Sequence, residues 1–224
     1  MDADRQGTLV ILACHGVFDA ARDTLYSEYV EDRPIYEDHI SYAFRHLRWR
    51  AEASPLLVIS GGYTKAERRC SESRSYLEAA EAMGIVIPSE VALDECSLTS
   101  VENVLFSLYV YRQRRGVWPA EVEAVSWEFK RFRFEKTLEA IGRWSRLGLA
   151  WPPLRFFPVG DLFGKLKTKA LQIEKAYTDA LEVGIDAYYQ VPETQKVVQR
   201  RDLYGARALA RQTFAGFPLP FAEI

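Results

Sequence analysis

Two cations that could hold an anion follow a short apolar segment near the middle of the chain. Residues 125–135 read VSWEFKRFRFE, and Lys130 and Arg133 stand three residues apart in this stretch. On a helix, that spacing places both side chains on one face. Arginine offers a rigid bidentate fork for phosphate or carboxylate, and lysine offers a compact charge. The pattern is typical of an anion site, and also of the solvated side of a helix that buries its Phe rings.

A second candidate is the glycine turn in 60-SGGYT-64. Gly61 and Gly62, directly after Ser60, allow a tight turn whose backbone amides could face an anion. No GK[ST] follows, so the turn is not a P-loop, and a plain strand-to-loop turn is the alternative. The basic loop at 63–70 could close over a ligand.

Carboxylates and hydroxyls form a third group of candidates. Ser71 and Glu72 open a predicted helix, where a serine N-cap and an acid in the first turn explain both residues without a ligand. Thr99 and Glu102 have the spacing of a capping box, in which the carboxylate reaches back to the amide of the cap. Alternatively, Glu72 and Glu102 are candidate general bases, and Thr99 is a ligand contact.

Four further residues follow predicted strands. Asn103 is not needed by the capping box and could point into a cleft or back to the loop. Asp94 could accept hydrogen bonds from ribose hydroxyls or be a turn acid. His15 could bind a phosphate or transfer a proton, because its pKa lies near neutrality. Cys14 beside it is more typical of a small buried side chain than of a nucleophile.

These candidates need a scaffold that brings several strand ends together. Strands alternating with helical patterns predict a three-layer α/β/α Rossmann-like sandwich with a mainly parallel five-stranded sheet. Ligands bind beyond the carboxyl ends of the strands in such a sheet, and the candidates lie there. The apolar segments that predict the strands are 8–13, 56–60, 90–94, 122–126 and 154–159.

The chain of 224 residues is expected to form a single domain,. Its core covers about residues 8–160, and a C-terminal helical extension covers about 161–224. Within the extension, residues 162–187 are predicted to form one long, charged helix. His39 and His46 fall on an earlier helix without partner spacing and are expected at the surface.

Composition excludes several classes of function. A net charge of -2 argues against a nucleic-acid binder, which needs a strong positive field,. No apolar run approaches the roughly 20 residues that span a bilayer, so no membrane contact is expected. Three cysteines without CxxC spacing, and only three histidines, predict a cytoplasmic protein without a disulfide frame or a metal centre among its own side chains,.

Taken in order, the motifs resemble the YdcF/SanA/ElyC family, and most closely its fungal-type branch. The motifs are a strand ending in CH, then SGG, then SE opening a helix, then ECSLTSVEN, then a strand running into EFKRFRF. The resemblance covers about residues 8–160, and weaker similarity continues through 201-RDLYG-205. Bacterial members usually carry a His at the position of Lys130, so any mechanism that needs this His is in doubt here.

The resemblance implies a Rossmann-like fold with a ligand at the strand ends. One bacterial member is thought to bind S-adenosylmethionine, and others are linked to cell-envelope metabolism and carry a membrane anchor. No such anchor is expected in this chain, so the resemblance does not imply an envelope role. By matching motif positions, the resemblance implies a site made of Gly61, Gly62, Glu72, Thr99, Glu102, Asn103, Lys130 and Arg133.

The leading hypothesis is an enzyme or binding protein for a small anionic ligand, nucleotide-like or phosphorylated, with phosphoryl transfer or hydrolysis as its reaction and a divalent metal as one cofactor to test. The first alternative is a protein that binds S-adenosylmethionine, such as a methyltransferase, with Asp94 or Glu95 at the ribose. The second is a non-catalytic interaction module that uses an exposed apolar stripe on the long helix. Under the leading hypothesis, Arg133→Ala removes binding with little loss of stability.

Overall fold

The computed structural model describes residues 5–19, 24–26, 33–65, 70–144, 151–161, 164–202 and 205–221, and the side chains of 164–167 are left undescribed. All five predicted strands are present, within one residue of the expected bounds at either end. They are β1 (Thr8–Ala13), β4 (Leu56–Ser60), β5 (Val91–Asp94), β6 (Glu121–Ser126) and β7 (Arg155–Pro158).

These strands form one sheet in the order β5-β4-β1-β6-β7, and every neighbouring pair is parallel. From β1 the chain moves outward through β4 and β5, and it then returns to the other side of β1 for β6 and β7. The order therefore reverses between β1 and β6, as in doubly wound α/β folds, where a crevice opens beyond the strands at this point. The predicted three-layer α/β/α fold with a parallel sheet is confirmed.

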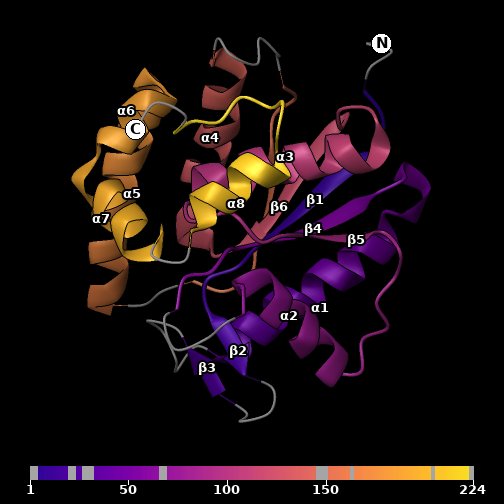
Figure 1. Ribbon diagram of the computed structural model, residues 1–224. Coiled ribbons are helices and arrows are strands. Elements are labelled where there is room, and N and C mark those ends of the chain that lie inside the picture. Colours follow the sequence, from indigo (N-terminus) through magenta and orange to yellow (C-terminus); the bar gives the residue numbers. More distant parts are fainter. Residues whose placement is uncertain are drawn as a thin grey trace.

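Helices cover both faces of the sheet (Figure 1). Side chains of β1 alternate between two cores: Leu9 and Ile11 pack toward α3 (Ser100–Arg115) and α4 (Arg131–Arg143), and Val10 and Leu12 pack toward α1 (Arg33–Trp49) and α2 (Glu72–Ala82). Every residue of β1 is buried, which explains its continuous apolar sequence,.

Local signals set the helix ends near the site. The hydroxyl of Ser71 accepts the amide of Arg74 at the start of α2, and that of Thr99 accepts the amide of Glu102 at the start of α3. Both residues are N-caps as predicted. Gly116 ends α3 in the left-handed region, at φ 74°,.

A small hairpin and two short 3-10 helices were not expected from the sequence. Strands β2 (Val17–Asp19) and β3 (Thr24–Tyr26) pair in antiparallel fashion, and the 3-10 helices are η2 (Ala51–Ala53) and η3 (Glu128–Lys130). The hairpin strands are only three residues long, which is too short for a periodic pattern to show.

The extension is helical, but the prediction of one helix over 162–187 is wrong. The helix α5 (Gly164–Val183) ends before Gly184, whose φ of 154° leaves the helical region, and α6 (Ile185–Gln190) follows. The chain continues with α7 (Pro192–Arg201) and α8 (Ala206–Thr213). A glycine between the two helices is a natural place for this break, because glycine lowers helix propensity and adopts such angles freely.

The expectation that His39 and His46 lie at the surface is also wrong. His39 is fully buried and its Nε2 lies 2.6 Å from the carbonyl oxygen of Val159. His46 is buried with its Nε2 2.7 Å from a carboxylate oxygen of Glu123. Both histidines extend the buried stripe of α1, since they stand three residues after Tyr36 and Ala43,. Burial lowers the pKa of His39 to about 4.

Candidate functional site

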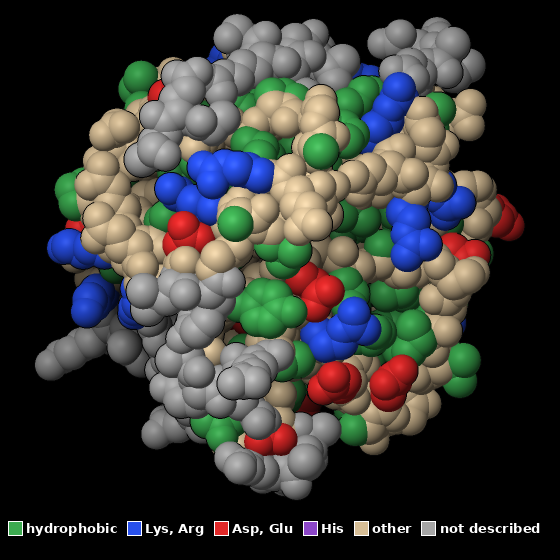
Figure 2. All heavy atoms as spheres, viewed as in Figure 1, with side chains coloured by type: hydrophobic (Ala, Val, Ile, Leu, Met, Phe, Trp, Pro, Cys, Tyr) green, Lys and Arg blue, Asp and Glu red, His purple; other side chains and the backbone are tan. Residues whose placement is uncertain are grey.

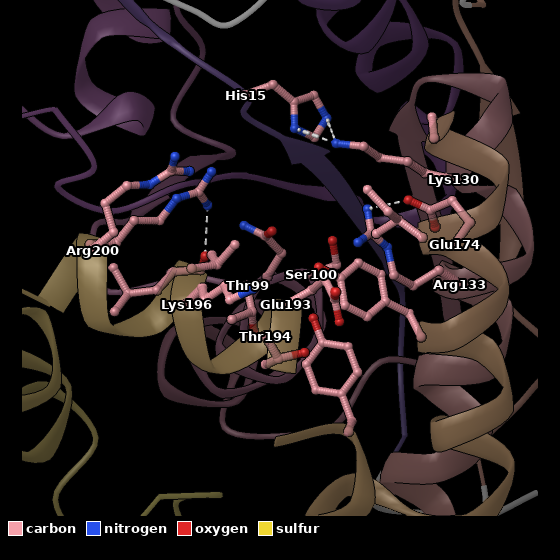
Figure 3. A pocket seen from close by; sticks show the side chains of 18 of the residues that line it. His15, Thr99, Ser100, Lys130, Arg133, Glu174, Glu193, Thr194, Lys196 and Arg200 are labelled. Carbon is pink, nitrogen blue, oxygen red and sulfur yellow. Dashed lines mark hydrogen bonds and ion pairs between the residues drawn. The ribbon is translucent and has the colours of Figure 1, made fainter. Parts of the chain in front are cut away.

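A cavity of about 570 Å³ lies beyond the carboxyl ends of β1 and β6, which is a usual size for a small-molecule site. His15 follows β1, and Lys130 follows β6. These strands are neighbours and parallel, so both side chains reach the same edge of the sheet. Residues of α5, α6 and α7 complete the lining, and Figure 3 shows the labelled side chains around the opening.

Basic side chains dominate the described part of this lining. Arg133 is buried, Lys130 and Arg201 are half-buried, and Lys196 and Arg200 are exposed on α7, across the cavity from Lys130 (Figure 3). The lining cations are Lys65, Lys130, Arg133, Lys169, Lys196, Arg200 and Arg201, and the lining acids are Glu174 and Glu193.

Lys130 and His15 are in contact at the centre of this site. Nζ of Lys130 lies 2.8 Å from Nδ1 of His15, and Nε2 of His15 lies 2.9 Å from Oγ of Ser126. Burial, and then the charge of Lys130, hold the pKa of His15 well below its usual value, so the ring is neutral. An ammonium group can only donate, so a charged Lys130 leaves the ring hydrogen on Nε2, facing Ser126. In that state His15 cannot remove the proton of Ser126.

Arg133 forms a buried ion pair with Glu174 of α5. Nη2 of Arg133 lies 3.0 Å from Oε1 of Glu174, and the guanidinium carbon lies 4.9 Å from the ring centroid of Tyr177. Burial raises the pKa of Glu174 above its usual value, although the charge of Arg133 opposes the shift. Arg133 is therefore a structural partner as well as a lining cation, and the expectation that it can be removed with little loss of stability has no support in this geometry.

The start of α3 forms another part of the wall, with Thr99 and Ser100 in the lining. Arg201 of α7 donates to the carbonyl oxygen of Leu98 over 2.7 Å, which ties the extension to this turn. Asn103 also borders the cavity, but its amide nitrogen donates to the carbonyl and hydroxyl oxygens of Ser60, over 3.0 and 2.8 Å. Its amide therefore points back to the end of β4.

The glycine turn does not present free amides. The amide of Gly61 donates to the carbonyl oxygen of Asp94 over 3.0 Å, and that of Gly62 donates to the carbonyl oxygen of Ser97 over 2.8 Å. Both donors are used within the protein, so the prediction of an anion-binding amide turn is wrong. The glycines serve close packing instead, because a Cβ on Gly61 would lie 2.7 Å from Cβ of Cys14.

Asp94 lies in a buried polar network rather than in the cavity lining. Its carboxylate accepts the hydroxyls of Ser60 (2.6 Å) and Ser97, and the amide of Cys96 (2.9 Å). Burial raises the pKa of Asp94 to about 6. At 1% exposure, this carboxylate cannot meet a ribose hydroxyl in the present conformation.

Glu102 and Glu72 are also buried outside the lining. The carboxylate of Glu102 accepts the amide of Leu98 over 2.5 Å and the hydroxyl of Tyr189 over 2.9 Å. The carboxylate of Glu102 thus accepts the amide of the residue before Thr99, and not the Thr99 amide that the capping box predicts. Burial raises the pKa of Glu102 to about 7. Glu72 accepts the hydroxyl of Thr64.

Glu102→Gln is expected to flatten the pH dependence of stability. Because the pKa of Glu102 in the folded protein is raised from 4.5 to about 7, the folded state binds the proton more tightly than the unfolded state does. The carboxyl therefore stabilises the fold below pH 4.5, and this contribution is lost as the pH rises toward 7. This rise in the pKa of Glu102 corresponds to about 3 kcal/mol in the free energy of unfolding.

Urea unfolding of wild type and variant between pH 4.5 and 8 measures this difference. A Gln side chain can still accept from Leu98 and donate to Tyr189, so the fold is retained. The control is Glu81→Gln, at an exposed position of α2. Parallel profiles for wild type and Glu102→Gln would contradict the assignment of the buried carboxyl.

The sequence interpretation missed the side chains that the extension supplies. Tyr177, Tyr188, Lys196 and Arg201 all line the cavity, whereas the sequence placed the segment that contains α7 in the extension and assigned no site residue to it. A signal was present, since Lys196 and Arg200 share a helix face at four residues' spacing. Like charges at this spacing repel slightly, and an anion opposite them would offset the repulsion. Residues 66–69 of the basic loop lie outside the described residues.

Within the described residues, no three His, Cys, Asp or Glu side chains lie close enough together to hold a metal ion. None of the described helices has the length and apolar character required to cross a bilayer. On the face shown in Figure 2, basic and acidic side chains are interspersed among apolar and uncharged ones.

Comparisons of the chain with protein-family models, with curated proteins and with solved structures found no match. The resemblance to the YdcF/SanA/ElyC family stays a prediction.

Proposed function

We propose that this protein binds a small phosphorylated compound, of nucleotide-like size, in the cavity at the ends of β1 and β6. The observation that carries the proposal is the charge of the lining, where seven Lys and Arg residues meet two Glu in the described part. The chain as a whole has a net charge of -2, so this concentration of cations is local. Grouped cations that are partly removed from water are costly unless an anion offsets them.

Two of these cations, Arg133 and Arg201, support a phosphate-binding centre. Burial and the charges of Arg133 and Arg201 lower the pKa of Lys130, which places the three groups within electrostatic reach of one another. Arg133 and Arg201 each use part of the guanidinium group on a protein acceptor, and each retains further N–H donors,. Charge-assisted hydrogen bonds from arginine suit phosphate oxygens in both geometry and strength.

The proposal covers binding and not hydrolysis. Phosphoryl transfer or hydrolysis was expected to use Glu72 and Glu102 as bases, and neither lines the cavity. The lining carboxylates are Glu174, which pairs with Arg133, and Glu193 on α7.

S-adenosylmethionine is less well supported as the ligand. Its sulfonium group is a cation and would meet a lining that is already rich in cations. Asp94, one of the two expected ribose contacts, is occupied by Ser60, Ser97 and Cys96. Glu95, the other, accepts the hydroxyl of Ser71 over 2.7 Å and does not line the cavity. The interaction-module hypothesis needs an apolar stripe on α5, but the exposed large apolar side chains of its described part are Leu171 and Val183, twelve residues apart.

Arg201→Gln is expected to weaken phosphate binding by at least about tenfold, since charge-assisted hydrogen bonds contribute about 1.5–3 kcal/mol. Calorimetry and thermal shift with inorganic phosphate, pyrophosphate, AMP and adenosine measure the effect. We expect the phosphorylated compounds to raise Tm and adenosine to leave it unchanged. The control is Lys175→Gln, an exposed position of α5 outside the lining. Equal shifts with AMP and adenosine, or none with any phosphorylated compound, would refute the proposal.

A further inference from the structure

Lys130 carries an amine that has no acidic partner in the described part of the chain. The contacts of Nζ are with His15, at 2.8 Å from Nδ1, and with the ring of Phe129, at 5.4 Å from the centroid. Glu174, the nearby lining acid, is held by Arg133 at 3.0 Å. A solvated lysine would not be half-buried, and an ion-paired lysine would contact a carboxylate,.

The position of Lys130 in the fold disfavours a charged amine further. Lys130 is the N-cap of α4, where the partial positive charge of the helix end repels a cation. Burial, followed by the charge of Arg133, lowers the pKa of Lys130 well below its usual value. The charged and titratable groups that face it from the surrounding elements are His15, His39, Glu72, Arg133, Glu174 and Arg201, and of these only Glu72 and Glu174 favour the ammonium form.

An uncharged lysine amine inside a cavity is a nucleophile for carbonyl carbon. His15 is suitably placed to move its protons, because its ring is neutral and lies at hydrogen-bond distance from Nζ. Ser126 holds the far side of the ring, at 2.9 Å from Nε2. The nucleophile, a proton carrier and the cations that would hold a phosphate therefore line one cavity (Figure 3).

We infer that Lys130 condenses with the carbonyl group of a phosphorylated aldehyde or ketone to form an imine, while Arg133 and Arg201 hold the phosphate. This inference rests on the proposed phosphate site for its substrate class. It makes Lys130 a catalytic residue and His15 a proton-transfer residue.

The step balances without any further reactant. The lone pair of Nζ forms a bond to the carbonyl carbon, and the carbonyl oxygen takes a proton that leaves the nitrogen through His15. The carbon–oxygen bond of the resulting carbinolamine then breaks, and the oxygen leaves as water with the second amine proton. One amine and one carbonyl group thus give one imine and one water.

Pyridoxal 5′-phosphate is a suitable probe because it joins an aldehyde to a phosphate and its imine absorbs visible light. The full-length protein is mixed with the probe, the imine is reduced with borohydride, and peptide mass spectrometry locates the adduct. We expect Lys130 to be labelled about tenfold or more faster than Lys65, Lys169 and Lys196, which line the same cavity, since each unit of lowered pKa raises the free-amine fraction about tenfold. Labelling spread evenly over the four lysines would overturn the inference.

Lys130→Arg tests whether the primary amine of Lys130, and not a positive charge at this position, forms the imine. The variant places a cation at this position and has no primary amine, so it should lose the visible imine band and still bind inorganic phosphate. An unchanged band would overturn the inference. The labelling pattern of the wild-type protein decides the question even if the variant folds poorly.

Pyridoxal, which lacks the phosphate, distinguishes failure of the inference from failure of the proposed function. If the phosphate site is wrong, pyridoxal and its phosphate label Lys130 equally well and inorganic phosphate does not compete. If the inference is wrong, inorganic phosphate binds and neither aldehyde prefers Lys130. We expect selective labelling by the phosphorylated aldehyde that excess inorganic phosphate slows.

Discussion

Arg133→Met is expected to lower the free energy of unfolding by about 3–5 kcal/mol, the usual cost of leaving one member of a buried ion pair without its partner. Arg133 and Glu174 are both 7% exposed, and their charged groups lie 3.0 Å apart. The loss should be smaller at pH 5 than at pH 8, because the pKa of Glu174 is already raised by burial. A lone Glu174 can then take up a proton, and stability increases as the pH falls.

The double variant Arg133→Met with Glu174→Leu should return close to wild-type stability, because apolar replacement of both members removes the uncompensated charge. Urea unfolding of the wild type, of Arg133→Met, of Glu174→Leu and of the double variant gives the coupling free energy of the pair. Lys136→Met is the matched control, since Lys136 pairs with Glu139 on the exposed side of the same helix. That variant should cost less than about 1 kcal/mol. An Arg133→Met protein as stable as the control would show that the buried pair contributes little.

Gly62→Ala is expected to destabilise the protein by about 3 kcal/mol or more, at the upper end of overpacking costs. A Cβ at Gly62 would lie 2.8 Å from the carbonyl oxygen of Ser97 and 3.0 Å from that of Glu95. These atoms belong to the backbone and cannot rotate away as a side chain could. Relief would require the loop after β5 to move, which would break the hydrogen bond from the amide of Gly62 to Ser97.

Gly84→Ala separates this close contact from the general cost of replacing glycine. Gly84 has a φ of +76° and no heavy atom near its virtual Cβ, so its replacement costs only the left-handed conformation, about 1–2 kcal/mol. Thermal and urea unfolding of the two variants give the comparison. If Gly62→Ala is no less stable than Gly84→Ala, the two loops are not packed as tightly as described.

Hydrophobic patterning alone was enough to predict the sheet. The segments 8–13 and 56–60 are near-continuous apolar runs, because every residue of β1 and β4 is buried from both faces,. The N-caps Ser71 and Thr99 were also readable, since capping is a contact between residues three apart in the chain,. Such signals are local, and a sequence displays them directly.

Only part of the candidate site could be predicted from the sequence. His15 was recognised because it stands just past a predicted strand, and Lys130 because it stands three residues before Arg133 in a basic segment that follows another. The roles of the glycine amides and of Glu102 were not predicted correctly, because their hydrogen-bond partners are Asp94, Ser97, Leu98 and Tyr189. The sequence does not indicate which residue pairs with a given donor or acceptor. Buried polar groups are nearly always paired, so a turn rich in donors is no evidence for a ligand until its partners are known.

The sequence by itself determined the strands, the helices that alternate with them and the edge of the sheet at which chemistry should be sought, because these depend on burial and on contacts along the chain. Only the tertiary structure decided that β1 and β6 are neighbours, which brings Nζ of Lys130 to 2.8 Å from His15. It also placed Glu174 and Arg201, from helices of the extension, in the same cavity lining as that pair. The physical reason is that the properties of the Lys130 amine arise from burial, from the nearby charge of Arg133, and from charges 44 to 71 residues away in the chain. The distant charges reach Lys130 only when the sheet and the extension have packed.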